Sequence, residues 1–172
     1  LFAFQNKIRP EQITDTDTIE ELTGGVSSRR NQLLMDMSAE LGVPAIDGAA
    51  EADVVTLRER VNTAAPSYAP FGSVLTEAIG ARLRQVLGSA SLAPSHVADY
   101  VTGTWALPAS WVPHVEAAVL LGTREEDSVR GGTLATLPQA SSKAEVATLL
   151  DAAVELVAAN HNQEVAKASA AA

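Results

Sequence analysis

The 172-residue chain contains no cysteine, which excludes both a disulfide framework and a thiolate metal site. Aromatic residues make up only 4% of the sequence, so alanine and the aliphatic side chains must fill any core. Such a composition favours helices that approach one another closely. The longest apolar run, VEAAVLLG at residues 115–122, is too short to cross a bilayer. We therefore expect no membrane-spanning segment.

Basic residues are also scarce, with 12 Lys and Arg against 21 Asp and Glu and a formal net charge of −9. A nucleic-acid surface needs clustered Lys and Arg, so we expect no nucleic-acid partner. The acidic balance fits a soluble protein that meets basic partners, and it fits equally a protein that uses charge only for solubility.

No constellation of catalytic or metal-ligating residues stands out. The histidines His96, His114 and His161 are scattered and have no partner four residues away, which argues against a metal site. The segment GGVSS lacks the lysine of a phosphate-binding NTPase loop, and GVSSR lacks the second glycine of a hydrolase nucleophile elbow. We expect no catalytic residue and no metal.

Apolar residues recur at helical spacing along most of the chain, and the alternation typical of strands is missing. The spacing predicts a helix over 27–41, whose apolar stripe leaves Asp36 and Glu40 facing outward. Other helices are predicted over 53–62, from Ser73 to a stop at Gly88, after Pro94, over 110–122, and from a capping box at Ser142 and Glu145. Residues 123–140 read as an exposed loop, and the fold class as all-α.

The two ends of the chain have their own patterns. Leu1, Phe4 and Ile8 fit the end of an amphipathic helix that Pro10 stops, so we expect this first helix to be truncated. After Asn160 the Ala-rich sequence resembles a linker.

The segment IEELTGGVSSRRNQLL, residues 19–34, places two hydroxyls at the start of a predicted helix. Gly24 and Gly25 can adopt the positive φ at which the preceding helix ends. Ser27 or Ser28 can be a simple N-cap, whose oxygen accepts a hydrogen bond from a free amide. Alternatively, the hydroxyl carries a phosphodiester, which the free amides and the helix dipole would stabilise. Arg29 and Arg30 follow directly and could hold a phosphate or contact a partner.

Two motifs resemble a known family. TIEELTGGVSSRRNQLLMDMSAELG is similar to the phosphopantetheine-bearing segment of acyl carrier domains in the type I fatty acid synthases of fungi and actinobacteria. In that family an ELxGG segment precedes one variable residue, the modified serine, a second hydroxyl, and an Asn four positions after the modified residue. YVTGTWALP matches a second family pattern through Tyr100, Trp105, Leu107 and Pro108. Val26 and Ser28 depart from stand-alone carriers, which have Asp and Leu there, and fungal domains usually have Lys in place of Val26.

The resemblance implies a four-helix acyl-carrier bundle over 1–66, a linker over 67–72, an additional helical structural subdomain over 73–160 packed against the bundle, and a linker over 161–172. It implies 4′-phosphopantetheine attached to Ser27, with Ser28 the less favoured site. The domain would catalyse nothing alone and would be cytoplasmic. It would carry acyl thioesters to the ketosynthase, ketoreductase, dehydratase, enoyl reductase and acyl or malonyl transferase domains, after modification by a phosphopantetheinyl transferase.

Arg29, Arg30, Asp36 and Glu40 are the residues that we expect to contact these partners. Two other readings stay open. One is a helical interaction module in which Ser27 only caps a helix. The other is a polyketide-type carrier, although such carriers lack a counterpart of residues 73–160.

Overall fold

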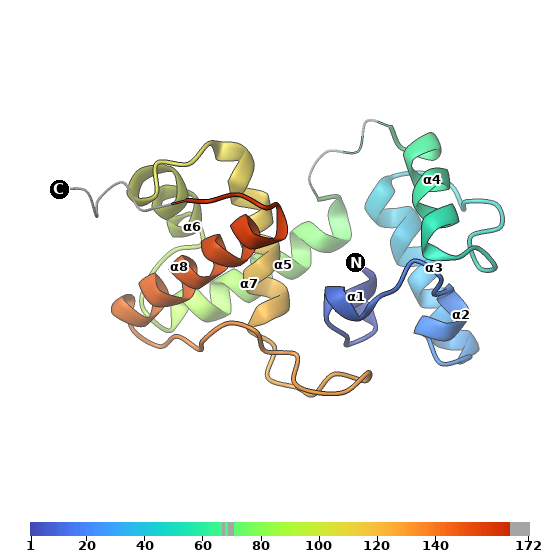
Figure 1. The fold of residues 1–172 in the computed structure, drawn as a ribbon, viewed down its shortest axis with the longest axis horizontal. Helices are drawn as coiled ribbons and strands as arrows, with labels where there is room; N and C mark the ends of the chain where they lie inside the picture. The colour runs from blue at the N-terminus through green and yellow to red at the C-terminus, as the bar shows by residue number, and fades with distance from the viewer. Residues whose placement is uncertain (67, 69–70, 166–172) are drawn as a thin grey trace. The chain divides into compact units, whose positions relative to one another are not determined.

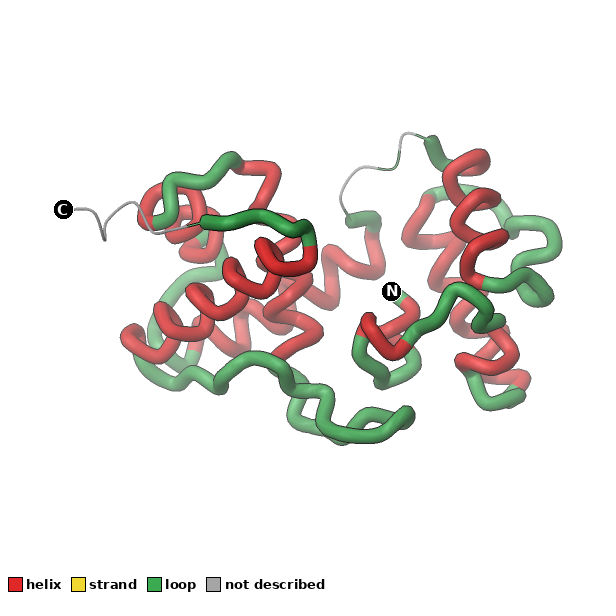
Figure 2. The backbone as a smooth tube through the Cα atoms, viewed as in Figure 1, coloured by secondary structure: helices red, strands yellow, loops and turns green. Residues whose placement is uncertain are grey.

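The structure is a computed structural model that describes residues 1–66, 68 and 71–165 (Figures 1 and 2). Within these ranges every regular element is helical, and Thr18 and Asp53 pair in an isolated antiparallel bridge. The fold class is therefore all-α, as the sequence predicted. The chain forms two units: residues 1–76 with 126–132 make the first, and residues 77–125 with the chain from 133 onward make the second.

The first unit includes residues 73–76, at the start of the helix that begins at Ser73, and the loop 126–132, both of which the sequence-based ranges placed in the second subdomain. Parts of the two expected linkers, residues 67, 69–70 and 166–172, lie outside the described residues.

The first unit contains α1 (Phe2–Gln5), a 3₁₀ turn (Pro10–Gln12), α2 (Ile19–Leu22), α3 (Ser27–Leu41) and α4 (Val54–Ala64). Thr18 begins α2 with a capping box, since its side chain accepts from the Glu21 N–H and the Glu21 carboxylate accepts from the Thr18 N–H. Asp53 caps α4 by accepting from the Thr56 N–H at 2.9 Å. Buried residues of α2, α3, α4 and the loop between α3 and α4 form its core: Ile19, Leu33, Met37, Ala49, Ala52 and Leu57.

The second unit contains the greater part of α5 (Ser73–Gly88), then α6 (His96–Asp99), a π-helical turn (Tyr100–Thr104), a 3₁₀ turn (Ala109–Trp111), α7 (Val112–Gly122) and α8 (Lys143–Asn160). Ser142 caps α8 by accepting from the Glu145 N–H at 3.2 Å, which is half of the predicted capping box. α7 packs against α8, and seven residues of α8 are buried. Residues 123–140 form a loop, as predicted, and most of them are exposed, but Leu134 and Leu137 are buried in it.

The YVTGTWALP motif forms the π-helical turn and the residues that follow it. The Tyr100 hydroxyl and the Trp105 indole N–H both donate to Asp151 Oδ1 of α8, at 2.6 and 3.1 Å. Trp105 is only 4% exposed. Two side chains of the motif are therefore attached to α8 by the Asp151 carboxylate, and Trp105 is part of the core of the second unit.

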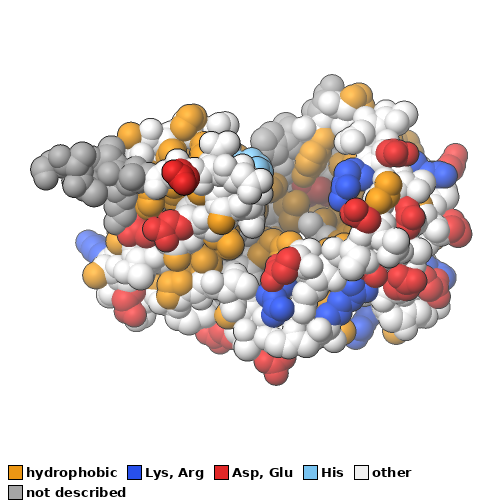
Figure 3. Space-filling view, viewed as in Figure 1, with side chains coloured by type: hydrophobic (Ala, Val, Ile, Leu, Met, Phe, Trp, Pro, Cys, Tyr) orange, Lys and Arg blue, Asp and Glu red, His pale blue; other side chains and the backbone are white. Residues whose placement is uncertain are grey.

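In the part of the chain that the structure describes, no helix is both long and apolar enough to cross a bilayer. The space-filling view in Figure 3 shows acidic and basic side chains interspersed over the first unit. On the same face the second unit shows more hydrophobic atoms and few basic side chains.

Candidate functional site at the start of α3

The turn before α3 is made by two glycines in the left-handed region. Gly24 and Gly25 have φ of +63° and +73°, and a Cβ at Gly24 would have no atom within 4 Å. The glycines are therefore required by backbone conformation rather than by crowding. A Cβ at Gly25 would meet only the Glu20 carboxylate, at 3.7 Å.

Ser27 is the first residue of α3, after an N-cap position occupied by Val26. The first helical hydrogen bond runs from the Arg30 N–H to the Val26 carbonyl at 3.0 Å. The amides of Ser27, Ser28 and Arg29 therefore lack an acceptor within the helix, as is normal for a first turn. These amides and the dipole of a 15-residue helix favour an anion at this position.

Neither serine has a structural task at this helix end. Both are exposed, and the hydroxyls of Ser27 and Ser28 form no hydrogen bond within the described residues. No side chain caps α3, so the reading in which one of these serines is an N-cap finds no support. A free hydroxyl beside free amides is suited to modification.

The two arginines after the serines differ in their surroundings. Arg30 pairs with Glu20 of α2 at 3.1 Å, across the glycine turn. Arg29 is exposed and forms no ion pair within the described part of the chain. Arg29 is thus the cation near Ser27 that remains free to meet an anionic group.

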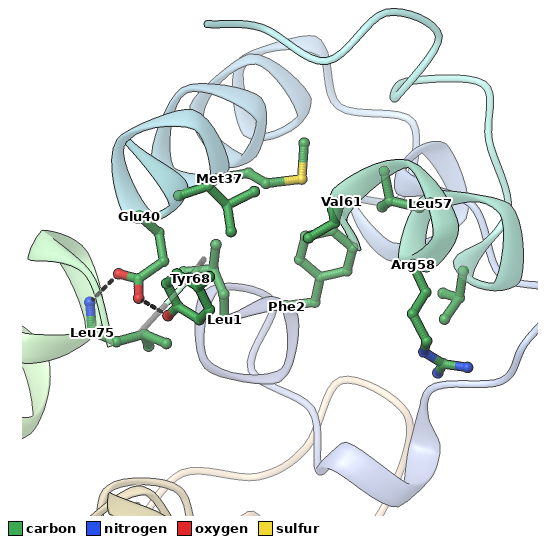
Figure 4. Close-up of a pocket in the computed structure, with 11 residues that line it drawn as sticks. Leu1, Phe2, Met37, Glu40, Leu57, Arg58, Val61, Tyr68 and Leu75 are labelled. Atoms are coloured by element: carbon green, nitrogen blue, oxygen red, sulfur yellow. Dashed lines mark hydrogen bonds between the residues drawn. The ribbon is translucent and has the colours of Figure 1, made fainter. Parts of the chain in front are cut away.

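The expectation that Glu40 faces outward is wrong. The residue is 4% exposed, and its carboxylate accepts hydrogen bonds from the Tyr68 hydroxyl and from the Leu75 N–H, the latter at 2.7 Å (Figure 4). The Gly72 N–H donates to the same carboxylate at 2.5 Å. The approach is close because Gly72 lies against the Glu40 backbone, where a Cβ would come within 1.8 Å of the carbonyl oxygen. Burial and the neighbouring carboxylate raise the pKa of Tyr68 to about 12. Glu40 therefore holds the start of α5 and cannot offer its charge to a partner.

Asp36 is half-buried and accepts from Gln5 Nε2 at 2.5 Å and Gln32 Nε2 at 2.9 Å. Its charge is more accessible than that of Glu40. Two apolar side chains at or on α3 are exposed instead: Val26 at its N-cap, at 42%, and Met35 further along it, at 66%. The exposed surface of α3 thus includes both a free arginine and apolar side chains.

An apolar pocket of about 320 Å³ lies in the first unit, at the far end of α3 from Ser27 (Figure 4). Aliphatic and aromatic side chains form most of its wall, among them Leu1, Phe2, Met37, Leu57 and Val61. From Ser27 to Met37 the helix rises by about 15 Å at 1.5 Å per residue. Tyr68 and Leu75, held by Glu40, line the same pocket.

The histidines are less scattered than the sequence indicated. The rings of His114 and His161 meet edge to face with centroids 5.0 Å apart, at the start of α7 and the end of α8. Among residues 1–66, 68 and 71–165, no group of three or more His, Asp or Glu side chains could hold a metal ion. Two exposed imidazoles leave most coordination positions unfilled.

Sequence reasoning also missed the ion pair between the buried Asp17 and Arg130, since 113 positions separate them and no local pattern marks either residue.

No protein-family model matches the chain, and a search of curated proteins finds no match.

Proposed function

We propose that the chain is the acyl carrier domain of a type I fatty acid synthase and that Ser27 is the attachment site of 4′-phosphopantetheine. The observation that carries this proposal is the exposed Ser27 hydroxyl, which has no hydrogen-bond partner in the described chain and opens a helix after a double-glycine turn. The motifs of the first and second halves support it, because both occur in that family in this order.

The residues around Ser27 fit a phosphodiester. The free amides of the first turn would donate to its oxygens, and Arg29 would offset its charge. The open space at Gly24 would admit the backbone of a modifying enzyme. When attached, the arm supplies a terminal thiol that carries acyl groups as thioesters.

The chain itself would catalyse nothing, and its contribution would be effective concentration. A tethered acyl group meets each active site intramolecularly, at roughly millimolar levels for a short flexible linker. The proposed partners are the condensing, reducing, dehydrating and acyl-transferring domains of the same cytoplasmic synthase. Arg29, Arg30 and Asp36 are the proposed contact residues, with Glu40 now removed from that set. The apolar pocket adds support, because its wall could shelter an alkyl chain.

The decisive experiment is intact-mass analysis of the purified chain after incubation with coenzyme A and a phosphopantetheinyl transferase. We expect the mass of one arm on the wild type and on Ser28→Ala, and none on Ser27→Ala. Ser28→Ala is the matched control because Ser28 is also exposed and makes no capping bond. An arm on Ser28 would overturn the residue assignment. A wild type that stays unmodified with transferases of several classes would favour the interaction module.

A further inference from the structure

The loop 126–132 has a conformation of its own. The Ser128 N–H donates to the Gly132 carbonyl at 2.8 Å, and the Gly131 N–H donates to the Ser128 carbonyl at 3.0 Å. Gly131 and Gly132 have φ of +98° and +74°, which other residues rarely adopt. Val129 is 70% exposed beside this turn. The loop is thus a compact turn that presents the side chain of Arg130.

This loop binds the connection between α1 and α2, within the first unit. The Val129 N–H donates to the Lys7 carbonyl at 3.0 Å, and Gln12 Nε2 donates to the Gly131 carbonyl at 3.0 Å. Arg130 Nη1 also donates to the Gln12 carbonyl at 2.7 Å, so the loop donates to the connection as well as accepting from it. These reciprocal bonds satisfy backbone groups in a connection whose only regular structure is one 3₁₀ turn.

Arg130 also forms a two-pronged ion pair with Asp17, with Nη1–Oδ2 and Nη2–Oδ1 distances of 2.6 and 3.0 Å. Asp17 is only 7% exposed and accepts a further bond from the Thr14 N–H at 2.7 Å. Its own carbonyl accepts from the Val54 N–H at 2.8 Å, which joins the connection to the start of α4. Asp17 immediately precedes the cap of α2, so its position sets where α2 begins.

We infer that residues 126–132 are a staple that holds residues 7–17 in place and thereby fixes the start of α2 and the glycine turn that leads to Ser27. The carrier unit is then incomplete without a segment from far along the chain. Arg130 is a positioning residue: it contacts neither serine and acts through Asp17. Its effect on modification rests on the proposed function, whereas its effect on local order does not.

Hydrogen exchange of the full-length chain tests the staple directly. In Arg130→Met we expect amides of residues 12–24 to exchange faster by about tenfold or more, because a buried carboxylate loses its charged partner. Amides of α8 in the second unit should keep their rates. Val129→Ala is the matched control, since it alters an exposed neighbour in the same turn. Unchanged exchange at 12–24, or equal acceleration in α8, would overturn the inference.

Two further variants separate the ion pair from general damage. Arg130→Lys keeps the positive charge but cannot form the two-pronged pair with Asp17. The exchange rates of this variant should therefore fall between those of wild type and Arg130→Met. Asp17→Asn combined with Arg130→Met should be no worse than the more damaging single variant, because the two changes remove one interaction. Additive effects would show that the residues act independently and would refute the staple.

Modification kinetics provide the readout that rests on the proposed function. With the same transferase, Arg130→Met should lower kcat/KM for the attachment at Ser27, and Arg130→Lys should restore part of it. If kcat/KM were equal for wild type and Arg130→Met, the staple would have no effect on the modification of Ser27. A wild type that is never modified would refute the proposed function, while the exchange result would still decide whether the staple exists.

Discussion

Asp17 is a buried carboxyl of the first unit whose ionisation is coupled to folding. Its hydrogen bonds with Arg130 hold the pKa of the carboxyl well below its usual range, against the opposing effect of burial. A lowered pKa stabilises the fold at every pH above the ordinary value of about 4, and this contribution is lost as the pH falls further. At neutral pH, Asp17→Asn should cost about 1.5–3 kcal/mol.

The test is urea unfolding of wild type and Asp17→Asn at several pH values. The difference in unfolding free energy should be constant at neutral pH and should shrink as the pH falls below about 4. A difference that stays constant through the acid range would mean that the Asp17 charge contributes nothing.

The Glu40 carboxylate joins the end of α3 to the start of α5, and it also helps to raise the pKa of Tyr68. Glu40→Ala should lower the unfolding free energy by about 1–3 kcal/mol, because three partly buried donors lose their acceptor. Glu40→Gln keeps one carbonyl oxygen and should lose less. In a Tyr100→Phe background, ultraviolet titration should place the pKa of Tyr68 at about 12, and Glu40→Gln should lower it. If the pKa of Tyr68 were the same in wild type and in Glu40→Gln, the hydrogen bond between Tyr68 and Glu40 would be contradicted.

At the scale of an element, the π-helical turn at Tyr100–Thr104 depends on one acceptor in α8. Asp151→Ala leaves the Tyr100 hydroxyl and the Trp105 indole without their shared carboxylate, at a cost of about 1–3 kcal/mol. Asp151→Asn should cost less because an amide oxygen can still accept. Trp105→Ala removes a buried ring and should cost about 3–5 kcal/mol. Denaturant unfolding measures all three, and a wild-type midpoint for Trp105→Ala would contradict its burial.

The boundaries of the longer helices could be read from local sequence. α3 spans Ser27–Leu41 and α5 spans Ser73–Gly88, both as predicted, because apolar spacing and glycine stops act within a few residues. The expected first helix is only the four-residue α1, and Ile8 is buried outside it. Lys7, at φ +52°, breaks the helix before Pro10 is reached.

The candidate site was only partly predictable. The start of α3 at Ser27, with its free amides, follows from local sequence, but the free hydroxyl does not, because the sequence left open an N-cap role that the structure gives to Val26. The burial of Glu40 does not, because Tyr68, Gly72 and Leu75 reach it from about thirty residues away. The same holds for Asp17 and Arg130. Amphipathic spacing can place a side chain on the outer face of its own helix, but a distant segment can still cover it.

At the scale of the whole molecule, the net charge of −9 should influence association with the proposed partners. Opposite charge on those domains would speed encounter, and added salt would reduce the effect as the Debye length falls to about 8 Å near physiological ionic strength. Acyl-transfer rates with separate catalytic domains should therefore fall as salt rises. Glu40→Gln should leave the salt dependence unchanged, since its carboxylate is buried. If the acyl-transfer rates did not change with ionic strength, tethering alone would bring the partners together.

The exposure of Met35 has a consequence for oxidative chemistry. The chain has two methionines: Met35 is 66% exposed on the outer face of α3, whereas Met37 is 4% exposed in the core. Dilute peroxide should convert Met35 to its sulfoxide well before Met37, making the α3 face polar without disturbing the interior. The oxidation rate of Met35 therefore reports whether the α3 face is covered, and the rate of Met37 is the internal control. A partner that covers α3 should slow oxidation of Met35, and one that binds elsewhere should leave it unchanged.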